Sequence, residues 1–426
     1  MFVKPQKMIS HTNLNHLLLM PKHYDLTQSR KEVDVLLQKH SLFKELYLLE
    51  KSISPILSTL EESGLLISGE WFKSGLQEKQ NQLVAVRNEI NQMMGEAVSD
   101  QVDEDKLHHY WKLRELPVAK GMDELIMYRK LHPSFQMMLT YKNYQNYLKM
   151  WGQRLLEKGT TVDGGVILQA QWRSFTSYTG RIYARNLPLT SLPNEMRNYI
   201  MTPKDYQIIS LDINAAELRF MAYHAKCGSL VQKIQKGIDV LTEISDMIRY
   251  IFDSHDITGK QLRKLAKEFT YSLAYGSGIQ TITKKMRKIF PHVTSVEVDR
   301  LRAVFYDTYP ELQHFLNERG KSEKLLTVFG EIEPVAKFTT TQKKNFTLQH
   351  SVAVALKVLL NVLAENDFEI IHVVHDEVWF LVEENIYLDE FIKQVEERFE
   401  KEIEMILPGL PTNGILSKEK LRGEKI

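Results

Sequence analysis

Residues 259–278, GKQLRKLAKEFTYSLAYGSG, place apolar and polar side chains on opposite sides of an expected α-helix that ends at glycines. The apolar positions recur every three or four residues and form the side that packs: Leu262, Leu265, Ala266, Phe269 and Leu273. On the other side four residues are spaced four apart, so each drifts by only about 40° around a helix. In chain order they are two cations and two aromatic rings: Arg263, Lys267, Tyr271 and Tyr275.

This polar face suits a ligand that has a polyanionic end and a flat base. Arginine and lysine hold phosphate groups, and aromatic rings stack on bases. A nucleoside triphosphate combines both features. A solvated basic face is the commoner outcome of such spacing, however, and from this segment alone it is the favoured interpretation.

Two further patterns predict β-structure that holds acidic residues. In residues 206–225, a short apolar run at 208–213 predicts a strand with Asp212 near its end. Residues 369–382, EIIHVVHDEVWFLV, contain two β-rich runs on either side of His375-Asp376-Glu377. We therefore expect a hairpin with an acidic turn.

Three motifs give these patterns a common context. They are Asp-x4-Glu-Leu-Arg at 212–219, Arg-x3-Lys-x3-aromatic-x3-Tyr-Gly at 263–276 and Val-His-Asp-Glu at 374–377. In this order they resemble the three polymerase motifs of family A DNA polymerases, the group of bacterial DNA polymerase I. Two more segments resemble regions of the family that touch DNA: Tyr-Thr-Gly-Arg at 178–181 and Asn-x3-Gln at 345–349. The matches cover most of residues 165–382, and weaker similarity extends to about residue 45.

The resemblance implies an α+β right-hand polymerase fold, with an antiparallel-sheet palm, helical fingers and a helical thumb. The expected division is an N-terminal extension at 1–45, a thumb region at 46–160, a first palm segment at 161–230, fingers at 231–344 and a second palm segment at 345–426. Helical patterns at 48–68, 71–95 and 128–151 fit this plan, the first with a stop at a glycine and the last two as an amphipathic pair in the thumb.

Two basic segments are open to more than one interpretation. Between residues 141 and 149 tyrosines and lysines interleave, as on a surface that follows a phosphate backbone, although packed tyrosines and solvated lysines fit equally well. The basic run at 284–288 is expected either on a solvated helical face or along the template channel.

The resemblance also implies phosphoryl transfer with two Mg²⁺ ions, in which a primer 3′-oxygen attacks the α-phosphorus and pyrophosphate leaves. Such ions stabilise the attacking and departing oxygens and need hard oxygen ligands. Asp212 and Asp376 are the expected catalytic residues and metal ligands, and the backbone carbonyl of Ile213 is a further expected ligand. Glu377 adjoins this site without being assigned as a ligand.

The same resemblance assigns residues to the incoming deoxynucleotide (dNTP). Arg263 and Lys267 hold its β- and γ-phosphates, and Lys267 is also the catalytic proton donor or charge stabiliser for pyrophosphate. Tyr271 lies beside the sugar, and Tyr275 packs against the templating or incoming base. Glu217 stands against the 2′ position, so a ribose hydroxyl is disfavoured.

Four residues are expected to bind the primed template DNA. Arg181 should reach the minor-groove edge of the primer-terminal pair, while Gln349 and His375 should lie along the primer strand. Gly276 allows the helix end to approach the template, which a side chain would obstruct. The chain departs from the family pattern at 215–216, where Ala-Ala stands in place of the common Gln-Ile.

Two alternative functions remain open on these grounds. A single-subunit RNA polymerase shares the Arg-Lys-Tyr-Gly helix, but it lacks the glutamate found here at Glu217 and typically ends its last motif in His-Asp-Ser rather than His-Asp-Glu. A catalytically silent protein that binds primed DNA is expected to have lost one of three residues, and all are present: Asp212, Asp376 and Lys267.

Composition bears on the size, charge and cellular location of the protein more than on its function. The 426 residues, 43% of them hydrophobic, suffice for two or three cores, and a net charge of +1 requires that any DNA-binding surface arise from segregated charges. A single cysteine, Cys227, excludes an internal disulfide. No apolar run approaches bilayer-spanning length and no signal peptide is evident, so we expect a cytoplasmic monomer without a membrane partner. The 45 residues before the polymerase portion leave no room for the family's exonuclease, so we expect no proofreading.

Overall fold

A four-stranded antiparallel sheet lies at the centre of the larger portion of the chain. The computed structural model describes residues 41–174, 178–252, 256–332, 337–385 and 387–425. The sheet has the order β10-β11-β7-β12, in which β7 (Tyr206–Ile213) lies between β11 (Glu377–Glu383) and β12 (Leu416–Leu421), with β10 (Glu369–Val374) at the edge. The predicted strand and the predicted hairpin are both confirmed, and they are neighbours in one sheet.

Contacts between residues divide the described chain into two compact units. The first comprises residues 41–64, Ala170–Leu192 and Thr202–Arg422, and the second comprises Leu65–Gln169, Pro193–Met201 and residues 423–425. The predicted thumb region, 46–160, therefore contributes helices to both units. The five-segment division itself stays a prediction, and most of the expected N-terminal extension, 1–40, lies outside the described residues.

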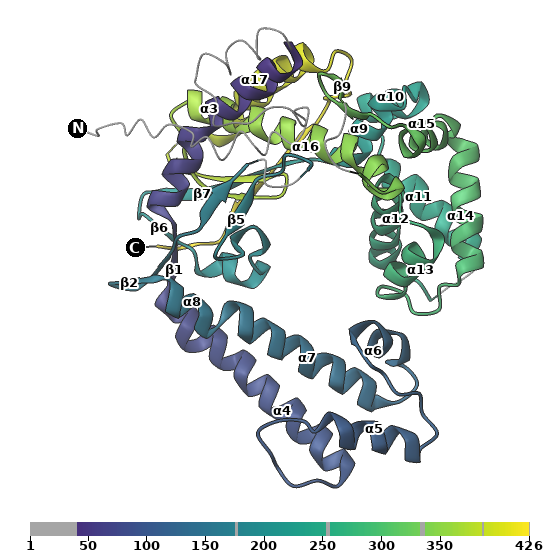
Figure 1. Cartoon of the computed structure of the whole chain (residues 1–426). Helices are drawn as coiled ribbons and strands as arrows, with labels where there is room; N and C mark the ends of the chain where they lie inside the picture. The colour runs from purple at the N-terminus through teal and green to yellow at the C-terminus, as the bar shows by residue number, and fades with distance from the viewer. Residues whose placement is uncertain (1–40, 175–177, 253–255, 333–336, 386, 426) are drawn as a thin grey trace. The chain divides into compact units, whose positions relative to one another are not determined.

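The first unit is mostly helical, and α3 (Ser41–Ser63) and α16 (Thr340–Glu365) among its helices pack against the sheet. Its other helices in the described residues are α9 (Ala216–His224), α10 (Gly228–Gln235), α11 (Val240–Phe252), α12 (Gly259–Ala274), α13 (Ile279–Arg287), α14 (Ser295–Thr308), α15 (Pro310–Lys321) and α17 (Leu388–Ile406). Helix α16 packs against α3, α9, α15 and α17, while α11 to α14 form a separate group of neighbouring helices (Figure 1). Shorter elements complete the unit: β4 (Gln171–Arg173), β5 (Tyr183–Arg185), η2 (Leu189–Ser191), β8 (Leu325–Thr327) and β9 (Gly330–Ile332).

The second unit is built mainly on two long helices that pack together, the pair that the sequence predicts. Its elements are β1 (Leu65–Ser68), η1 (Trp71–Gly75), α4 (Leu76–Met94), α5 (Glu104–Leu113), α6 (Met122–Tyr128), α7 (Pro133–Trp151), α8 (Gln153–Lys158), β2 (Thr160–Val162), β3 (Gly165–Leu168), η3 (Asn194–Tyr199) and β13 (Glu424–Lys425). The short strand β6 (Met201–Thr202) lies where the chain passes from one unit to the other. Helices α4 and α7 pack against each other over a core that includes Trp111, Phe135 and Met138.

Two helix boundaries are set by a glycine and a proline, and one of them differs from the sequence prediction. The helical pattern within 48–68 stops at a glycine, as expected: α3 ends at Ser63, Gly64 turns the backbone with φ +67°, and Leu65–Ser68 forms a strand paired with β3. The helix expected at 128–151 starts only at Pro133, which occupies the first turn, and the preceding His132 is extended. Proline has no amide hydrogen to donate within a helix, so it begins α7 rather than continuing an earlier helix.

Helix α16 corrects the expectation that no segment could match a bilayer in length. Its 26 residues are long and apolar enough by composition, but 89% of the apolar window is buried inside the protein. Sixteen residues from Phe346 to Leu363 are buried, so the apolar character of α16 serves packing in the core of the first unit.

One buried histidine on α16 is expected to make stability depend on pH. His350 is 2% exposed, and burial, followed by the nearby charge of Lys357, lowers its pKa to about 3. In the unfolded chain a histidine takes up its proton near pH ~6.5. Below about pH 6.5 the unfolded state therefore binds more protons, and stability falls by up to ~1.4 kcal/mol per pH unit until the folded pKa is reached.

The His350→Leu variant should lose this component of the pH dependence. Urea unfolding of the variant and of the natural protein at pH 7.5, 6.0 and 5.0 measures the difference, with the exposed His314→Gln as the matched control. A stability difference between His350→Leu and the natural protein that stays constant over this range would contradict the expectation.

Candidate active site

Ten of the twelve predicted site residues line one pocket of about 450 Å³ in the first unit. They come from segments far apart in the sequence: Arg181, Asp212, Ile213, Glu217, Arg263, Lys267, Tyr271, Tyr275, His375 and Asp376. The two predicted residues outside the lining are Gly276 and Gln349. The pocket lining thus combines the end of β7 and the adjacent hairpin turn with the polar face of α12.

The two predicted carboxylates are brought together by strand pairing. Asp212 is the second-last residue of β7 and lies in register with Glu377 of β11, next to Asp376 in the chain. The amide of Ile213 donates to the carbonyl of Asp376 at 3.2 Å. Burial, then the charges of Asp212 and Glu217, raise the pKa of Asp376 to about 7. Negative charge is therefore concentrated at this end of the sheet, as a cation site requires.

The side chain of the neighbouring Glu377 does not line the pocket and is engaged in two hydrogen bonds. Its carboxylate accepts from the hydroxyl of Ser210 and from the indole N–H of Trp379, the latter at 2.6 Å. His375, at the tip of the same hairpin, has a left-handed backbone with φ +53°. The hairpin turn therefore has a specific conformation that presents His375 and Asp376 to the pocket.

Glu217 is a buried carboxylate with two partners from other segments. It lies in the first turn of α9 with 7% of its surface exposed. The hydroxyl of Tyr275 donates to its Oε1, and Nη2 of Arg181 lies 3.7 Å from the same oxygen. Nε of Arg181 is buried and has no acceptor among the described residues, so it is a donor that a bound ligand could satisfy.

Helix α12 presents its four polar residues as the sequence predicts, while its predicted apolar side is buried. It ends at Ala274, four residues before Gly278, with Tyr275 as the cap residue. Arg263 forms an ion pair with Asp239. Lys267 makes no ion pair among the described residues and lies 5.3 Å from the centre of the Tyr271 ring. Lys267 is thus the cation on this face that remains available to an anionic ligand.

The lining also includes three residues that the sequence analysis did not assign: Asn214, Ala215 and Leu241. Ala215 has a left-handed backbone, φ +50°, at the start of α9. This conformation turns the chain between β7, which carries Asp212, and α9, which carries Glu217. An alanine gives no sequence indication of positive φ, which glycine or asparagine would have given.

Arg219, which the sequence analysis also left without an assigned role, holds this turn by hydrogen bonds to backbone carbonyls. Its guanidinium donates to the carbonyls of Asn214, Pro411, Asn413 and Gly414 at 2.7 to 3.0 Å. Arg219 is 4% exposed, and burial lowers its pKa to about 10. The arginine of the Asp-x4-Glu-Leu-Arg motif therefore has a structural role, because four backbone carbonyls occupy it.

The comparisons with known proteins agree with this geometry. The family model described as DNA polymerase family A matches residues 73–410, most of the chain. The chain belongs to this family. Family A DNA polymerase I of Helicobacter pylori is 22% identical over 297 residues, covering 66% of this chain and 32% of the relative. DNA polymerase I of Caldicellulosiruptor bescii is 20% identical over 387 residues, covering 82% of this chain and 44% of the relative. The chain therefore spans less than half the length of these family A relatives.

A solved family A structure has the same fold. The POL domain of Pol1 from M. smegmatis, in complex with DNA primer-template and dNTP, superposes with a TM-score of 0.74 at 18% identity, covering 91% of this chain and 73% of that domain. The α+β polymerase fold expected from the sequence is thereby confirmed.

Membership in family A implies a divalent metal, and the residues present fit one. Among the described residues no group of three or more His, Cys, Asp or Glu side chains could hold a metal ion. Magnesium usually takes only one or two protein carboxylates and completes its shell with water and substrate phosphates. Asp212 and Asp376 offer that donor set, and a bound cation would offset both the burial and the repulsion from Asp212 that raise the pKa of Asp376.

Of the two predicted site residues outside the pocket lining, Gly276 directly follows the lining residue Tyr275, and Gln349 lies on α16. Gly276 follows the end of α12 with φ +69°, and a Cβ there would approach the side chain of Lys344 to 2.9 Å. Both the backbone angle and this contact favour glycine. Gln349 is partly exposed on α16, one turn after Asn345, whose amide donates to the hydroxyl of Tyr178 at 3.4 Å.

Several residues of the two basic segments are buried or form ion pairs within the protein. Lys285 lies 3.2 Å from Glu268 and donates to Ser272, and Met286 of the basic run is buried. In the second unit Tyr141 is 3% exposed and Lys142 pairs with Glu104 at 2.6 Å. For these residues the contacts favour packing and ion pairing, whereas roles in DNA binding stay predictions.

Proposed function

We propose that the chain is a DNA-directed DNA polymerase that adds dNTPs to the 3′ end of a primer on a template. The observation that supports this most directly is the pocket, which is lined by a carboxylate at the end of β7, a second carboxylate in the adjacent hairpin turn and a helix face with cations followed by tyrosines. A pair of Mg²⁺ ions held by Asp212, Asp376 and the carbonyl of Ile213 would supply charge stabilisation for in-line phosphoryl transfer.

The side chains of α12 would bind the triphosphate end of the dNTP. Lys267, which has no ion pair among the described residues, would neutralise the phosphates and donate a proton to the departing pyrophosphate. Arg263 would join it by exchanging its contact with Asp239 for a phosphate. Such an exchange keeps the guanidinium paired in both states and requires only a side-chain movement.

The other lining residues would orient the sugar, the bases and the primer. Glu217 would stand against the 2′ position, and Tyr275, whose hydroxyl donates to Glu217, would pack its ring against the templating or incoming base. Arg181 would use its buried Nε toward a base edge in the minor groove. His375 and Gln349 would contact the primer strand, and Gly276 would allow the template to approach. Cytoplasmic location, a monomeric state and the lack of a membrane partner stay predictions.

Primer extension tests this proposal. The purified full chain, with a labelled primer on a DNA template, Mg²⁺ and dNTPs, should give template-dependent products. Parallel reactions with ribonucleotides and with an RNA template distinguish the RNA polymerase alternative and reverse transcription. Binding of primed DNA without any extension would overturn the proposal in favour of a catalytically silent binding protein.

Tyr271 yields a prediction about dideoxynucleotides. Its hydroxyl has no hydrogen bond among the described residues, and its ring lies against Lys267 in the pocket. A normal dNTP can bridge toward its own phosphates through its 3′-hydroxyl, but a dideoxynucleotide lacks this group, and the phenol can replace the missing hydrogen bond. A bond of this kind to a charged group contributes roughly 1.5 to 3 kcal/mol, which is about ten- to a hundredfold in selectivity.

We therefore expect ready incorporation of dideoxynucleotides by the natural protein and their rejection by Tyr271→Phe. The measurement is the ratio of dNTP to ddNTP incorporation efficiency for both proteins on one template. Tyr306→Phe, which removes a phenol on α14 outside the pocket lining, is the matched control. Equal ratios for the natural protein and Tyr271→Phe would refute the role of this hydroxyl.

A further inference from the structure

A buried ion pair joins α3 to α16 within the first unit. The ammonium of Lys357 contacts Oε1 of Glu50, and their side chains are 2% and 8% exposed. Neither residue lines the candidate active site. Removing two charges from water is costly, and well-packed apolar residues often hold two helices together equally well. The pair therefore raises the question of what else it contacts.

Lys357 has a second acceptor in the segment that leads to the active site. Its ammonium donates to the carbonyl of Gly180 at 2.7 Å. Gly180 is buried, has φ +77° and directly precedes Arg181. The left-handed conformation turns the chain at this point, so the carbonyl of Gly180 points to α16 while the next residue reaches the pocket.

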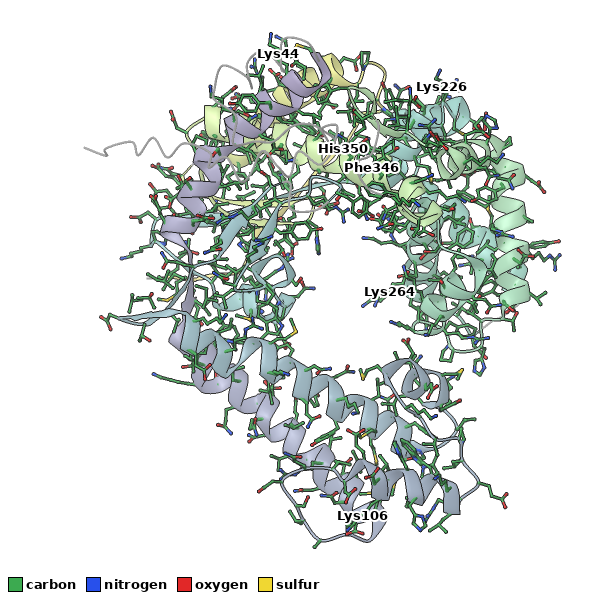
Figure 2. All side chains as sticks on the ribbon, viewed as in Figure 1. Lys44, Lys106, Lys226, Lys264, Phe346 and His350 are labelled. Carbon is green, nitrogen blue, oxygen red and sulfur yellow. The ribbon has the colours of Figure 1, made fainter. Side chains whose placement is uncertain are left out.

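The same helix holds the preceding carbonyl as well. Nδ1 of His350 lies 3.3 Å from the carbonyl oxygen of Thr179, and the imidazole stacks on Phe346 with ring centres 5.3 Å apart. Figure 2 shows Phe346 and His350 side by side on α16. Two successive carbonyls of the turn before Arg181 are therefore bound by side chains of one rigid core helix.

The position of Arg181 depends on this turn. Its Nη2 is 3.7 Å from Glu217, and its Nε is a buried donor without an acceptor among the described residues. A shift of about 1 Å in a side chain that orients a reacting group can lower a rate about a hundredfold. We propose that Lys357, oriented by Glu50, is a positioning residue that fixes the Gly180 carbonyl and thereby sets Arg181 against Glu217 in the nucleotide site. This inference rests on the proposed polymerase function.

Replacing both residues of the ion pair with apolar ones distinguishes a positioning role from a purely stabilising one. Lys357→Met alone leaves Glu50 buried without its partner and should lower the melting temperature strongly. Glu50→Leu with Lys357→Met fills the same space with apolar groups and should restore the melting temperature, but it leaves the Gly180 carbonyl unbound. We expect this stable double variant to lose roughly ten- to a hundredfold in kcat for primer extension.

Two further readouts make the test specific. Amide hydrogen exchange of a peptide covering residues 178–185 should be at least about tenfold faster in the double variant than in the natural protein. In an Arg181→Met background the same two substitutions should cause little additional loss of kcat, because the group they position is absent. The matched control is Lys393→Met with Glu397→Leu, an exposed pair on α17, which should change neither measurement.

The outcomes distinguish this inference from the proposed function. A stable double variant with full activity and unchanged exchange at 178–185 would show that the pair only joins two helices, and it would overturn the inference. Fully additive losses with Arg181→Met would do the same. If the natural protein itself fails to extend a primer, the proposed function fails, and the exchange measurement alone decides whether the pair holds the turn.

Discussion

Replacing Asp212 or Asp376 with alanine should abolish primer extension, with a loss of roughly a thousandfold or more in kcat/KM. Both carboxylates line the same pocket, and strand pairing places them side by side at the end of β7 and in the adjacent hairpin turn. With the carbonyl of Ile213 they are the proposed metal ligands of this site, so neither carboxylate should replace the other. Affinity for primed DNA, measured by fluorescence anisotropy, should remain close to that of the natural protein.

The control for this experiment is an aspartate of the same unit outside the site. Asp307 is exposed on α14, so Asp307→Ala should extend primers at the natural rate. Titration of Mg²⁺ adds a second readout, because a variant with a weakened ion site should bind the ion more weakly even where some extension survives. Robust extension by either active-site variant would show that the assigned carboxylates are not the catalytic ones.

Glu217→Ala should relax discrimination against ribonucleotides by roughly ten- to a thousandfold, equivalent to about 1.4 to 4 kcal/mol. The Glu217 carboxylate is buried and fixed by the hydroxyl of Tyr275 and by Arg181, so it cannot easily move away from a 2′-hydroxyl. Alanine removes the obstructing group and leaves space at that position. The measurement is the ratio of dNTP to ribonucleotide kcat/KM on one template.

Tyr275→Phe separates the carboxylate from its hydrogen bond. This variant keeps Glu217 but removes the hydroxyl that fixes it, so most of the discrimination should survive if the carboxylate itself obstructs the ribose. An equal loss in Tyr275→Phe and Glu217→Ala would mean that the fixed orientation of the carboxylate matters more than its presence. An unchanged ratio in Glu217→Ala would place sugar selection elsewhere in the pocket.

Several features of the candidate site could be predicted because their determinants are local. The four polar residues of α12 share one face as a consequence of helical geometry, and the apolar run of β7 ends at Asp212 as strand patterning indicates. The identity and order of the motifs then placed these elements in one family. The glycine at φ +67° ends α3 as the pattern indicated, whereas the start of α7 was predicted less well, since the proline at position 133 decides it.

Contacts between distant residues could not be predicted, because periodicity describes one element at a time and does not say which side chains meet. Tyr275 and Glu217 are 58 residues apart, and Lys357 and Glu50 are 307 apart. Packing of α12, α9 and the turn before Arg181 brings the first pair together, and packing of α3 on α16 buries the second.

The sequence by itself thus determined the family, the α+β fold and the chemical character of each element, since these follow from motif order and from short-range patterns of apolar and polar residues. Only the tertiary structure decided which groups are paired and which are free to bind a ligand. Arg263 is paired with Asp239, whereas Lys267 has no ion pair among the described residues, although both are basic residues on the same helix face. The physical reason is that the availability of a charged group depends on its neighbours in space, and tertiary packing determines those neighbours.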